Sequence, residues 1–214
     1  MTTAAFNEFG SLKKVAVRTA AAAFVSEAKI ADEWQALRFY TAPKFVGAEA
    51  EHDTFVQLLR QAGAEIIELD AAGGLTLDAI YARDALLVSP AGLILCNMGR
   101  AGRNKEPLAN ARQLEGLGFS VAGSIEAPGT IEGGDLVWFD DNTLAVANGY
   151  RTNPEGIKQL SNLLPDVEVI AVPLPHWNGP SDVLHLMSFI SPVDKDLAVI
   201  YPRMMPVPFM NWLK

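Results

Sequence analysis

Three segments of the sequence set acidic residues or a histidine at the start of an apolar run. Glu132-Gly133-Gly134-Asp135 places two carboxylates around two glycines directly before the run 136–139, Asp84 stands before a second run, and His185 stands before a third. An imidazole beside a carboxylate can transfer protons, and several carboxylates can bind the N–H donors of a planar cation. The segment Glu-Gly-Gly-Asp alone is also typical of a tight turn before a strand, so the rest of the chain has to decide between the two interpretations.

The spacing of the three segments favours chemistry. Asp135 follows Asp84 by 51 residues, and His185 follows Asp135 by 50. A period of this size indicates one supersecondary unit repeated along the chain, here strand, turn, strand, helix, strand. Units with short strands and one covering helix bury their apolar faces best in a ring. Equivalent positions would then point at a common axis, where Asp84, Glu132, Asp135 and His185 would meet.

Apolar periodicity predicts the elements that position these residues. Strands are expected at 13–18, 64–69, 84–88, 93–96, 119–122, 135–139, 143–147, 167–172, 187–190 and 197–201, with a turn at 191–196. Helices are expected at 31–40, 48–62, around 108–117, from 153 to 164, and from near 208. Asn153 is the expected N-cap of the fourth helix, with Pro154 in its first position. The residues expected to face inward are Phe55, Leu58, Leu59, Ala62, Leu108, Ala111, Leu114, Leu117, Ile157, Leu160 and Leu164.

Composition limits the class of protein. The chain has 214 residues, half of them apolar, which suits a single domain over 1–214, and it lacks a run of eighteen apolar residues. The N-terminal residues 1–8 lack the basic start and apolar core of a signal peptide, and the one cysteine, Cys96, fits a reducing, cytoplasmic compartment. A net charge of −8 argues against a nucleic-acid surface and is compatible with a small cationic substrate, or with solubility alone. Three scattered histidines and one cysteine predict no metal or other cofactor.

Five segments, in their order and spacing, resemble one enzyme family. The chain resembles the dimethylarginine dimethylaminohydrolase family of the guanidino-group-modifying, or pentein, superfamily, which also holds amidinotransferases and arginine deiminases. The matching segments are 78–84, 103–106, 125–135, 151–156 and 184–186. The resemblance implies a pentein α/β propeller of repeated ββαβ units with pseudo-fivefold symmetry. It also implies a hydrolase that converts dimethylarginine to citrulline and dimethylamine through a cysteine nucleophile.

The resemblance implies a role for each candidate site residue. His185 is expected to be the general acid and base, with Glu132 as the carboxylate that pairs with it. The remaining candidates are expected to bind substrate: Asp84 and Asp78 the guanidinium, Arg103 and Arg151 the α-carboxylate, and Asp135 the substrate or, more simply, the glycine turn. Each also has a plain alternative, such as a surface ion pair for the arginines. His176 and His52 are expected to be surface or loop residues.

Two positions leave the substrate open. Arg83, directly before Asp84, resembles the arginine deiminase version, whereas Met187, two residues after His185, favours the dimethylarginine branch. The alternatives are therefore an arginine deiminase, an amidinotransferase or an agmatine-type iminohydrolase.

The nucleophile is the main departure from the family pattern. Cys96 lies in an apolar strand, where a buried structural thiol is the default. The period would place the start of a fifth unit near residue 235, so that unit and its cysteine are expected to be missing from this chain, which is expected to be inactive. The chain would then be a C-terminally incomplete enzyme domain or a non-catalytic remnant that binds a cationic amino acid. Open strand edges would favour self-association into a homo-oligomer.

Overall fold

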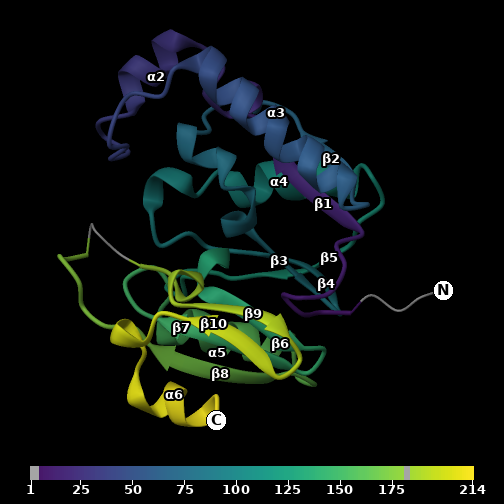
Figure 1. Ribbon diagram of the computed structural model, residues 1–214, viewed down its shortest axis with the longest axis vertical. Helices are drawn as coiled ribbons and strands as arrows, with labels where there is room; N and C mark the ends of the chain where they lie inside the picture. The colour runs from purple at the N-terminus through teal and green to yellow at the C-terminus, as the bar shows by residue number, and fades with distance from the viewer. Residues whose placement is uncertain (1–4, 181–183) are drawn as a thin grey trace. The chain divides into compact units, whose positions relative to one another are not determined.

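The computed structural model describes residues 5–180 and 184–214. Residues 1–4, where the segment considered for a signal peptide begins, and residues 181–183 lie outside this description. The sequence predicted one domain, and the structure groups the chain into two compact units, each discontinuous in sequence (Figure 1). Unit 1 comprises Met1–Gly10, Arg83–Ala101 and Phe119–Lys214, and unit 2 comprises Ser11–Ala82 and Gly102–Gly118.

Unit 2 is built around two parallel strands, β1 (Lys14–Arg18) and β2 (Glu65–Leu69), paired from Lys14 opposite Glu65 to Arg18 opposite Leu69. Parallel strands need a long crossover. The helices α1 (Ala20–Phe24), α2 (Glu27–Glu33) and α3 (Phe45–Gln61) provide it, and the 3-10 turn η1 (Leu77–Ile80) and helix α4 (Glu106–Glu115) complete the unit. Its core is a small cluster: Ala20, Ala23, Phe24, Ile30 and Leu77.

The helices of unit 2 differ from the prediction in their faces. In α3, Val56 is 3% exposed, whereas Phe55 and Leu58, both predicted to face inward, are 50% and 59% exposed. Residues 55, 58, 59 and 62 satisfy helical spacing, but a second apolar stripe through 45, 48 and 56, one residue out of step, is the one that packs. The predicted helix at 31–40 is also wrong. The helix α2 starts earlier, because the Ser26 side chain accepts a hydrogen bond from Lys29 N and so caps it.

In α4, Ala111 and Leu114 face inward as predicted, but Leu108 and Leu117 are exposed. Leu117 lies beyond the end of the helix, so helical spacing no longer orients its side chain.

Unit 1 repeats a pair of antiparallel strands three times. The first pair is β3 (Leu86–Ser89) and β4 (Gly92–Leu95), with β5 (Val121–Ser124) parallel to β4. The second is β6 (Leu136–Asp140) and β7 (Thr143–Asn148), with β8 (Glu168–Pro173) parallel to β7 after helix α5 (Pro154–Leu163). The third is β9 (Ile190–Asp194) and β10 (Leu197–Ile200), followed by α6 (Val207–Trp212), coloured yellow in Figure 1.

A short 3-10 turn precedes each strand pair. The turns are η2 (Ala82–Ala85), η4 (Gly133–Asp135) and η5 (Leu186–Ser188). Asp84 lies in the first, Asp135 in the second, and His185 is the N-cap of the third. The residues singled out by their spacing therefore lie in or next to equivalent turns of the repeat, and His185 has the N-cap place that Glu132 has in η4.

Most strands of unit 1 lie close to the predicted ranges, but residues 84–85 of the predicted strand 84–88 belong to η2, and the strand predicted at 119–122 is observed at Val121–Ser124. Asn153 caps α5 by accepting a hydrogen bond from Gly156 N at 2.8 Å, and Pro154 takes the first position, as predicted. The predicted strand 187–190 and turn 191–196 are wrong, because Ser191 to Asp194 belong to β9. Pro192 suggested a turn, but in the described residues β9 pairs only with β10, and an edge strand tolerates proline.

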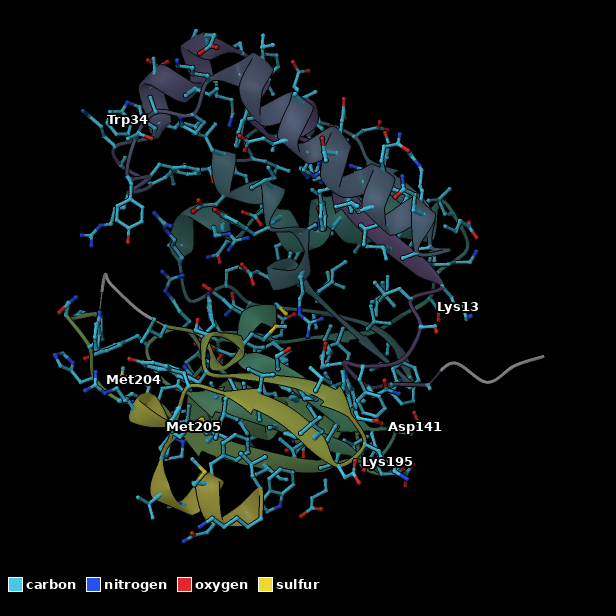
Figure 2. The ribbon with its side chains drawn as sticks, viewed as in Figure 1. Lys13, Trp34, Asp141, Lys195, Met204 and Met205 are labelled. Carbon is cyan, nitrogen blue, oxygen red and sulfur yellow. The ribbon has the colours of Figure 1, made fainter. Side chains whose placement is uncertain are left out.

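The core of unit 1 covers both faces of the sheet β6-β7-β8. Alternate residues, with Leu136, Trp138 and Leu144 among them, join one cluster, and Val137, Ala145 and Val172 join the other. Helix α5 contributes to the first cluster, and β9, α6 and Met205 to the second (Figure 2). Burial on both faces fixes the start of β6, and with it the turn η4 that carries the acidic residues.

The turns of the strand pairs are exposed. Asp141 and Lys195 in Figure 2 mark those between β6 and β7 and between β9 and β10. Within residues 5–180 and 184–214, each helix is too short or too polar to cross a bilayer.

Candidate active site

Two glycines allow the chain to come close at η4. A Cβ atom at Gly134 would lie 2.8 Å from His185 Cγ and 3.0 Å from Asp84 Oδ1, and one at Gly133 would overlap the Arg83 carbonyl. Real Cβ atoms essentially never approach so closely. The pair Gly133-Gly134 therefore lets the backbone of η4 lie directly against η2 and the His185 ring.

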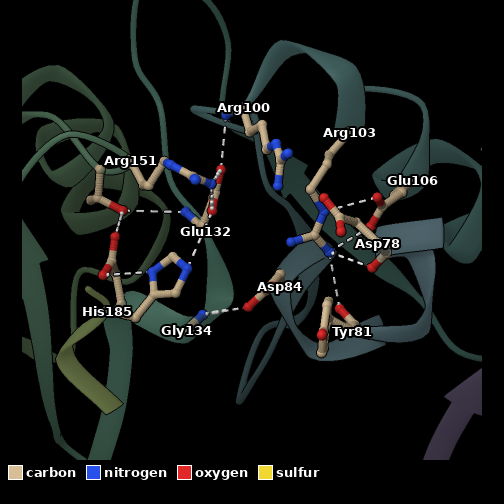
Figure 3. A network of polar contacts seen from close by, with 12 residues as sticks. Asp78, Tyr81, Asp84, Arg100, Arg103, Glu106, Glu132, Gly134, Arg151 and His185 are labelled. Carbon is tan, nitrogen blue, oxygen red and sulfur yellow. Dashed lines mark hydrogen bonds and ion pairs between the residues drawn. The ribbon is translucent and has the colours of Figure 1, made fainter. Parts of the chain in front are cut away.

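His185 lies between two carboxylates (Figure 3). Its Nδ1 is 3.0 Å from Asp135 Oδ1, and its Nε2 is 3.5 Å from Glu132 Oε2. The imidazole side chain is 24% exposed, while both carboxylates are buried. Each ring nitrogen thus faces a buried carboxylate, and the ring can still be reached from solvent.

Asp135 is the nearer carboxylate partner of the histidine, and its predicted role as a substrate ligand stays a prediction. Its Oδ1 also accepts a hydrogen bond from Leu186 N at 3.3 Å, and its Oδ2 accepts one from Thr152 Oγ1 at 2.7 Å. The residue is 1% exposed. Both carboxylate oxygens of Asp135 are therefore hydrogen-bonded within the protein.

Glu132 is fully buried and neutralised from within unit 1. Its two oxygens lie 3.1 and 2.9 Å from Arg151 Nη1, and Oε1 accepts a hydrogen bond from the backbone N–H of Arg100 at 2.9 Å. Glu132 flanks His185 as predicted, at the longer distance of the two carboxylates. Arg151, predicted to hold a substrate carboxylate, is instead paired with Glu132 and only 15% exposed.

Asp84 completes the acidic side of the site. Its Oδ1 accepts a hydrogen bond from Gly134 N at 3.0 Å, and its side chain is half-buried. The virtual Cβ of Gly134 meets both Asp84 and His185 at about 3 Å, so these two side chains lie over the same point of the backbone. Asp84 is the carboxylate of this group with the most access to solvent.

Burial and charge act against each other on His185. Burial disfavours the imidazolium, but the hydrogen bond to Asp135 and the charges of Asp135, Asp84 and Glu132 favour it more strongly, so the pKa of His185 is raised above its ordinary value. With a raised pKa, a larger fraction of His185 is protonated near neutral pH and can donate a proton. The neutral form can still accept one.

The other two predicted ligands belong to unit 2. Arg103 donates from Nε and Nη2 to the two oxygens of Glu106 at 2.9 and 2.8 Å, and from Nη2 to the carbonyls of Asp78 and Tyr81 at 3.2 Å. Arg103, Glu106 and Asp78 are all buried. Arg103 thereby ties η1 to the start of α4, a role that its sequence neighbours did not reveal.

The remaining chemical side chains have structural surroundings. Cys96 is 5% exposed in the core cluster beside Ile94 and Met98, as predicted for a structural thiol. Arg83 is exposed and donates to Glu8 at 2.8 Å. His176 lies in an exposed loop, 2.6 Å from the Tyr150 hydroxyl. No group of three or more His, Cys, Asp or Glu side chains is placed to hold a metal in the part of the chain that the structure describes.

Sequence reasoning missed Thr152 and Arg100. Thr152 is fully buried and contacts both acidic residues of η4, and Arg100 supplies a backbone N–H to Glu132. Thr152 stands inside the segment 151–156 that carries the family resemblance, which is the one signal that could have pointed to it.

Comparison with known proteins gives a family model, a relative and similar structures. The model described as N,N dimethylarginine dimethylhydrolase, eukaryotic, matches residues 41–208. An N(G),N(G)-dimethylarginine dimethylaminohydrolase from Pseudomonas aeruginosa is 25% identical over 122 residues, which are 57% of this chain and 47% of that protein. The chain spans about half the length of the curated relatives it matches.

Two solved structures resemble the chain over nearly all its length. The dimethylarginine dimethylaminohydrolase of Pseudomonas aeruginosa, a mutant complexed with citrulline, has a TM-score of 0.75 at 20% identity, covering 94% of this chain and 74% of that chain. SxtG, an amidinotransferase of Microseira wollei in saxitoxin biosynthesis, has a TM-score of 0.73 at 16% identity, covering 95% and 70%. At this level of identity the likeness establishes the fold.

Proposed function

Because the chain belongs to the N,N dimethylarginine dimethylhydrolase family, we propose that it carries the proton-transfer and cation-binding part of an enzyme that hydrolyses methylated arginine. The family and its structural neighbours are pentein hydrolases and transferases that act on guanidino groups. The closed ring and the absence of a fifth ββαβ repeat remain predictions.

The observation that carries the proposal is the placement of His185. Its Nδ1 is fixed by Asp135 at 3.0 Å, and Nε2, 3.5 Å from Glu132 Oε2, is the nitrogen proposed to exchange a proton with a substrate. The surrounding carboxylates raise the pKa of this imidazole, which supplies a proton donor for a leaving amine. These features suit a reaction that first protonates a leaving group and then deprotonates water.

A guanidinium fits the charge of the site. The carboxylates of Asp84, Glu132 and Asp135 gather in unit 1, and Arg151 offsets one of them. A planar cation with several N–H donors is bound best by carboxylates in its plane. Asp84, half-buried and beside the His185 ring, is the proposed ligand of the substrate cation. The neighbour from Pseudomonas aeruginosa was solved with citrulline, the product of the proposed reaction.

The proposed reaction has two steps. A thiolate adds to the guanidino carbon, the bond from this carbon to dimethylamine breaks, and the leaving nitrogen takes the proton from His185 Nε2. Water then adds to the resulting thiouronium carbon and gives one proton to neutral His185, the thiolate leaves, and the second water proton passes from the protonated citrulline to the released dimethylamine. The sum is dimethylarginine and water to citrulline and dimethylamine.

The thiol of this reaction is proposed to come from outside the 214 residues. Cys96, the one cysteine among them, is buried in the core of unit 1 beside residues of the sheet and is not expected to reach a substrate. The same observation supports a second candidate function, in which the chain binds a cationic amino acid without turning it over. A deiminase or amidinotransferase would share the site and differ in the amine that leaves or accepts.

The test measures binding and turnover separately. Calorimetry with dimethylarginine should show binding that Asp84→Asn weakens at least about tenfold, because a charge-assisted contact is lost. Citrulline release by the complete natural polypeptide should be abolished by His185→Ala and unchanged by the matched variant His176→Ala. Binding without citrulline would favour the second candidate, and activity that survives His185→Ala would refute the assigned proton transfer.

A further inference from the structure

Thr152 connects the two acidic residues of η4. Its Oγ1 is 3.2 Å from the backbone nitrogen of Glu132 and 2.7 Å from Asp135 Oδ2. The residue is fully buried, as are both partners. A buried hydroxyl with two polar partners is held in place. Removing it would leave a buried polar group without a hydrogen bond, which costs free energy.

The chemistry of the two partners fixes the direction of these hydrogen bonds. The Glu132 N–H can only donate, so the hydroxyl oxygen accepts there and its single hydrogen points to Asp135 Oδ2. Asp135 therefore accepts on Oδ2 and keeps Oδ1 for Leu186 N and His185 Nδ1. The Glu132 N–H donates to the Thr152 hydroxyl, and this hydroxyl donates to Asp135 Oδ2. His185 contacts the other carboxylate oxygen, Oδ1.

The position of Thr152 is itself held by the chain around it. Gly149 N donates to the Thr152 carbonyl at 2.8 Å, and Asn153 N donates to the Thr130 carbonyl at 3.1 Å. Asn153 then caps α5. A β-branched side chain on a backbone held from both sides has few rotamers, so its hydroxyl presents one direction to Asp135.

We propose that Thr152 is a positioning residue, which locks the Asp135 carboxylate so that Oδ1 meets His185 Nδ1. Its importance for catalysis rests on the proposed function, whereas its effect on His185 does not. The charged groups that face His185 are Asp135, Glu132 and Asp84, and Arg151 reaches it through Glu132. Among the contacts of the described residues, the Thr152 hydroxyl meets the carboxylate of Asp135 but only the backbone N–H of Glu132.

The experiment compares Thr152→Val with Thr152→Ser. Valine keeps the branched shape and removes the hydroxyl, and serine keeps the hydroxyl. The readout is the pH titration of the His185 ring by NMR. The pKa of His185 is expected to fall in Thr152→Val, because Asp135 turns away from the ring. It is expected to stay at the native value in Thr152→Ser and in the control Thr54→Val, whose hydroxyl bonds within α3.

A measurement on the unmodified protein covers the case in which the valine variant does not fold. The Thr152 hydroxyl proton is expected to give a slowly exchanging NMR resonance that moves as His185 titrates. A fast-exchanging hydroxyl, a native or higher His185 pKa in Thr152→Val, or equal titrations in the valine and serine variants would each overturn the proposal.

Turnover distinguishes this proposal from the function it rests on. If the complete enzyme hydrolyses dimethylarginine, Thr152→Val should lower kcat more than it changes KM, and Thr152→Ser should restore it. If the native enzyme forms no citrulline while the NMR shifts are as expected, the proposed function fails and the positioning role stands.

Discussion

Replacing Gly134 by alanine tests how tightly η4 holds the site. The added Cβ would lie 2.8 Å from His185 Cγ, 2.9 Å from Cδ2 and 3.0 Å from Asp84 Oδ1, where ordinary contact begins at 3.4 Å. The ring therefore has to move by at least about 0.6 Å. This displacement is large compared with the tolerance of its 3.0 Å hydrogen bond to Asp135. The backbone itself is not strained by the change, because Gly134 does not have a positive φ.

The expected cost of Gly134→Ala appears in both chemistry and stability. Overpacking at such a position costs about 1–3 kcal/mol of folding free energy. A displacement approaching 1 Å at a catalytic group can lower turnover about a hundredfold. Because this displacement would disturb the hydrogen bond to Asp135, the pKa of His185 should fall towards its ordinary value.

The assay for Gly134→Ala combines NMR titration of His185, urea unfolding and citrulline formation by the complete enzyme. Gly73→Ala is the matched control, since a Cβ there meets no atom within 4 Å and the residue has no positive φ. If Gly134→Ala keeps the native His185 titration and stability, the close approach of η4 to the ring does not exist in solution, and the reasoning about this site fails.

Three further predictions concern pH, ion pairs and association. The raised pKa of His185 stabilises the fold below about pH 6.5, the unfolded value, and this contribution is lost as pH rises through the folded pKa. Urea unfolding should therefore show a larger stability deficit for His185→Gln at acid than at alkaline pH, and a constant deficit would contradict the sign. Arg103→Met should cost about 3–5 kcal/mol, because Glu106 stays buried without its partner, whereas Arg60→Met at an exposed pair should cost under about 1 kcal/mol; equal unfolding midpoints would refute this contrast. Val199, 64% exposed on β10, is expected to support self-association, so Val199→Lys should reduce it in sedimentation velocity, and a wild-type protein that is already a monodisperse monomer would rule it out.

Much of unit 1 could be read from local sequence. Asn153 and Pro154 predicted the start of α5, and the apolar pattern predicted β6 and β7. These signals work because capping and strand alternation depend on residues a few positions apart. The interval of about fifty residues between Asp84, Asp135 and His185 likewise predicted equivalent turns, because each strand-pair repeat has the same local pattern.

The sequence by itself determined which residues would start the strand pairs and which of them could do chemistry. Tertiary structure alone decided their partners: Asp135 rather than Glu132 lies closest to His185, Arg151 is paired with Glu132, and Arg103 is committed to Glu106. It also chose Val56 over Phe55 as the buried residue of α3. Such choices depend on which of several compatible neighbours comes within about 3 Å after packing, and distances across the fold leave no trace in local spacing.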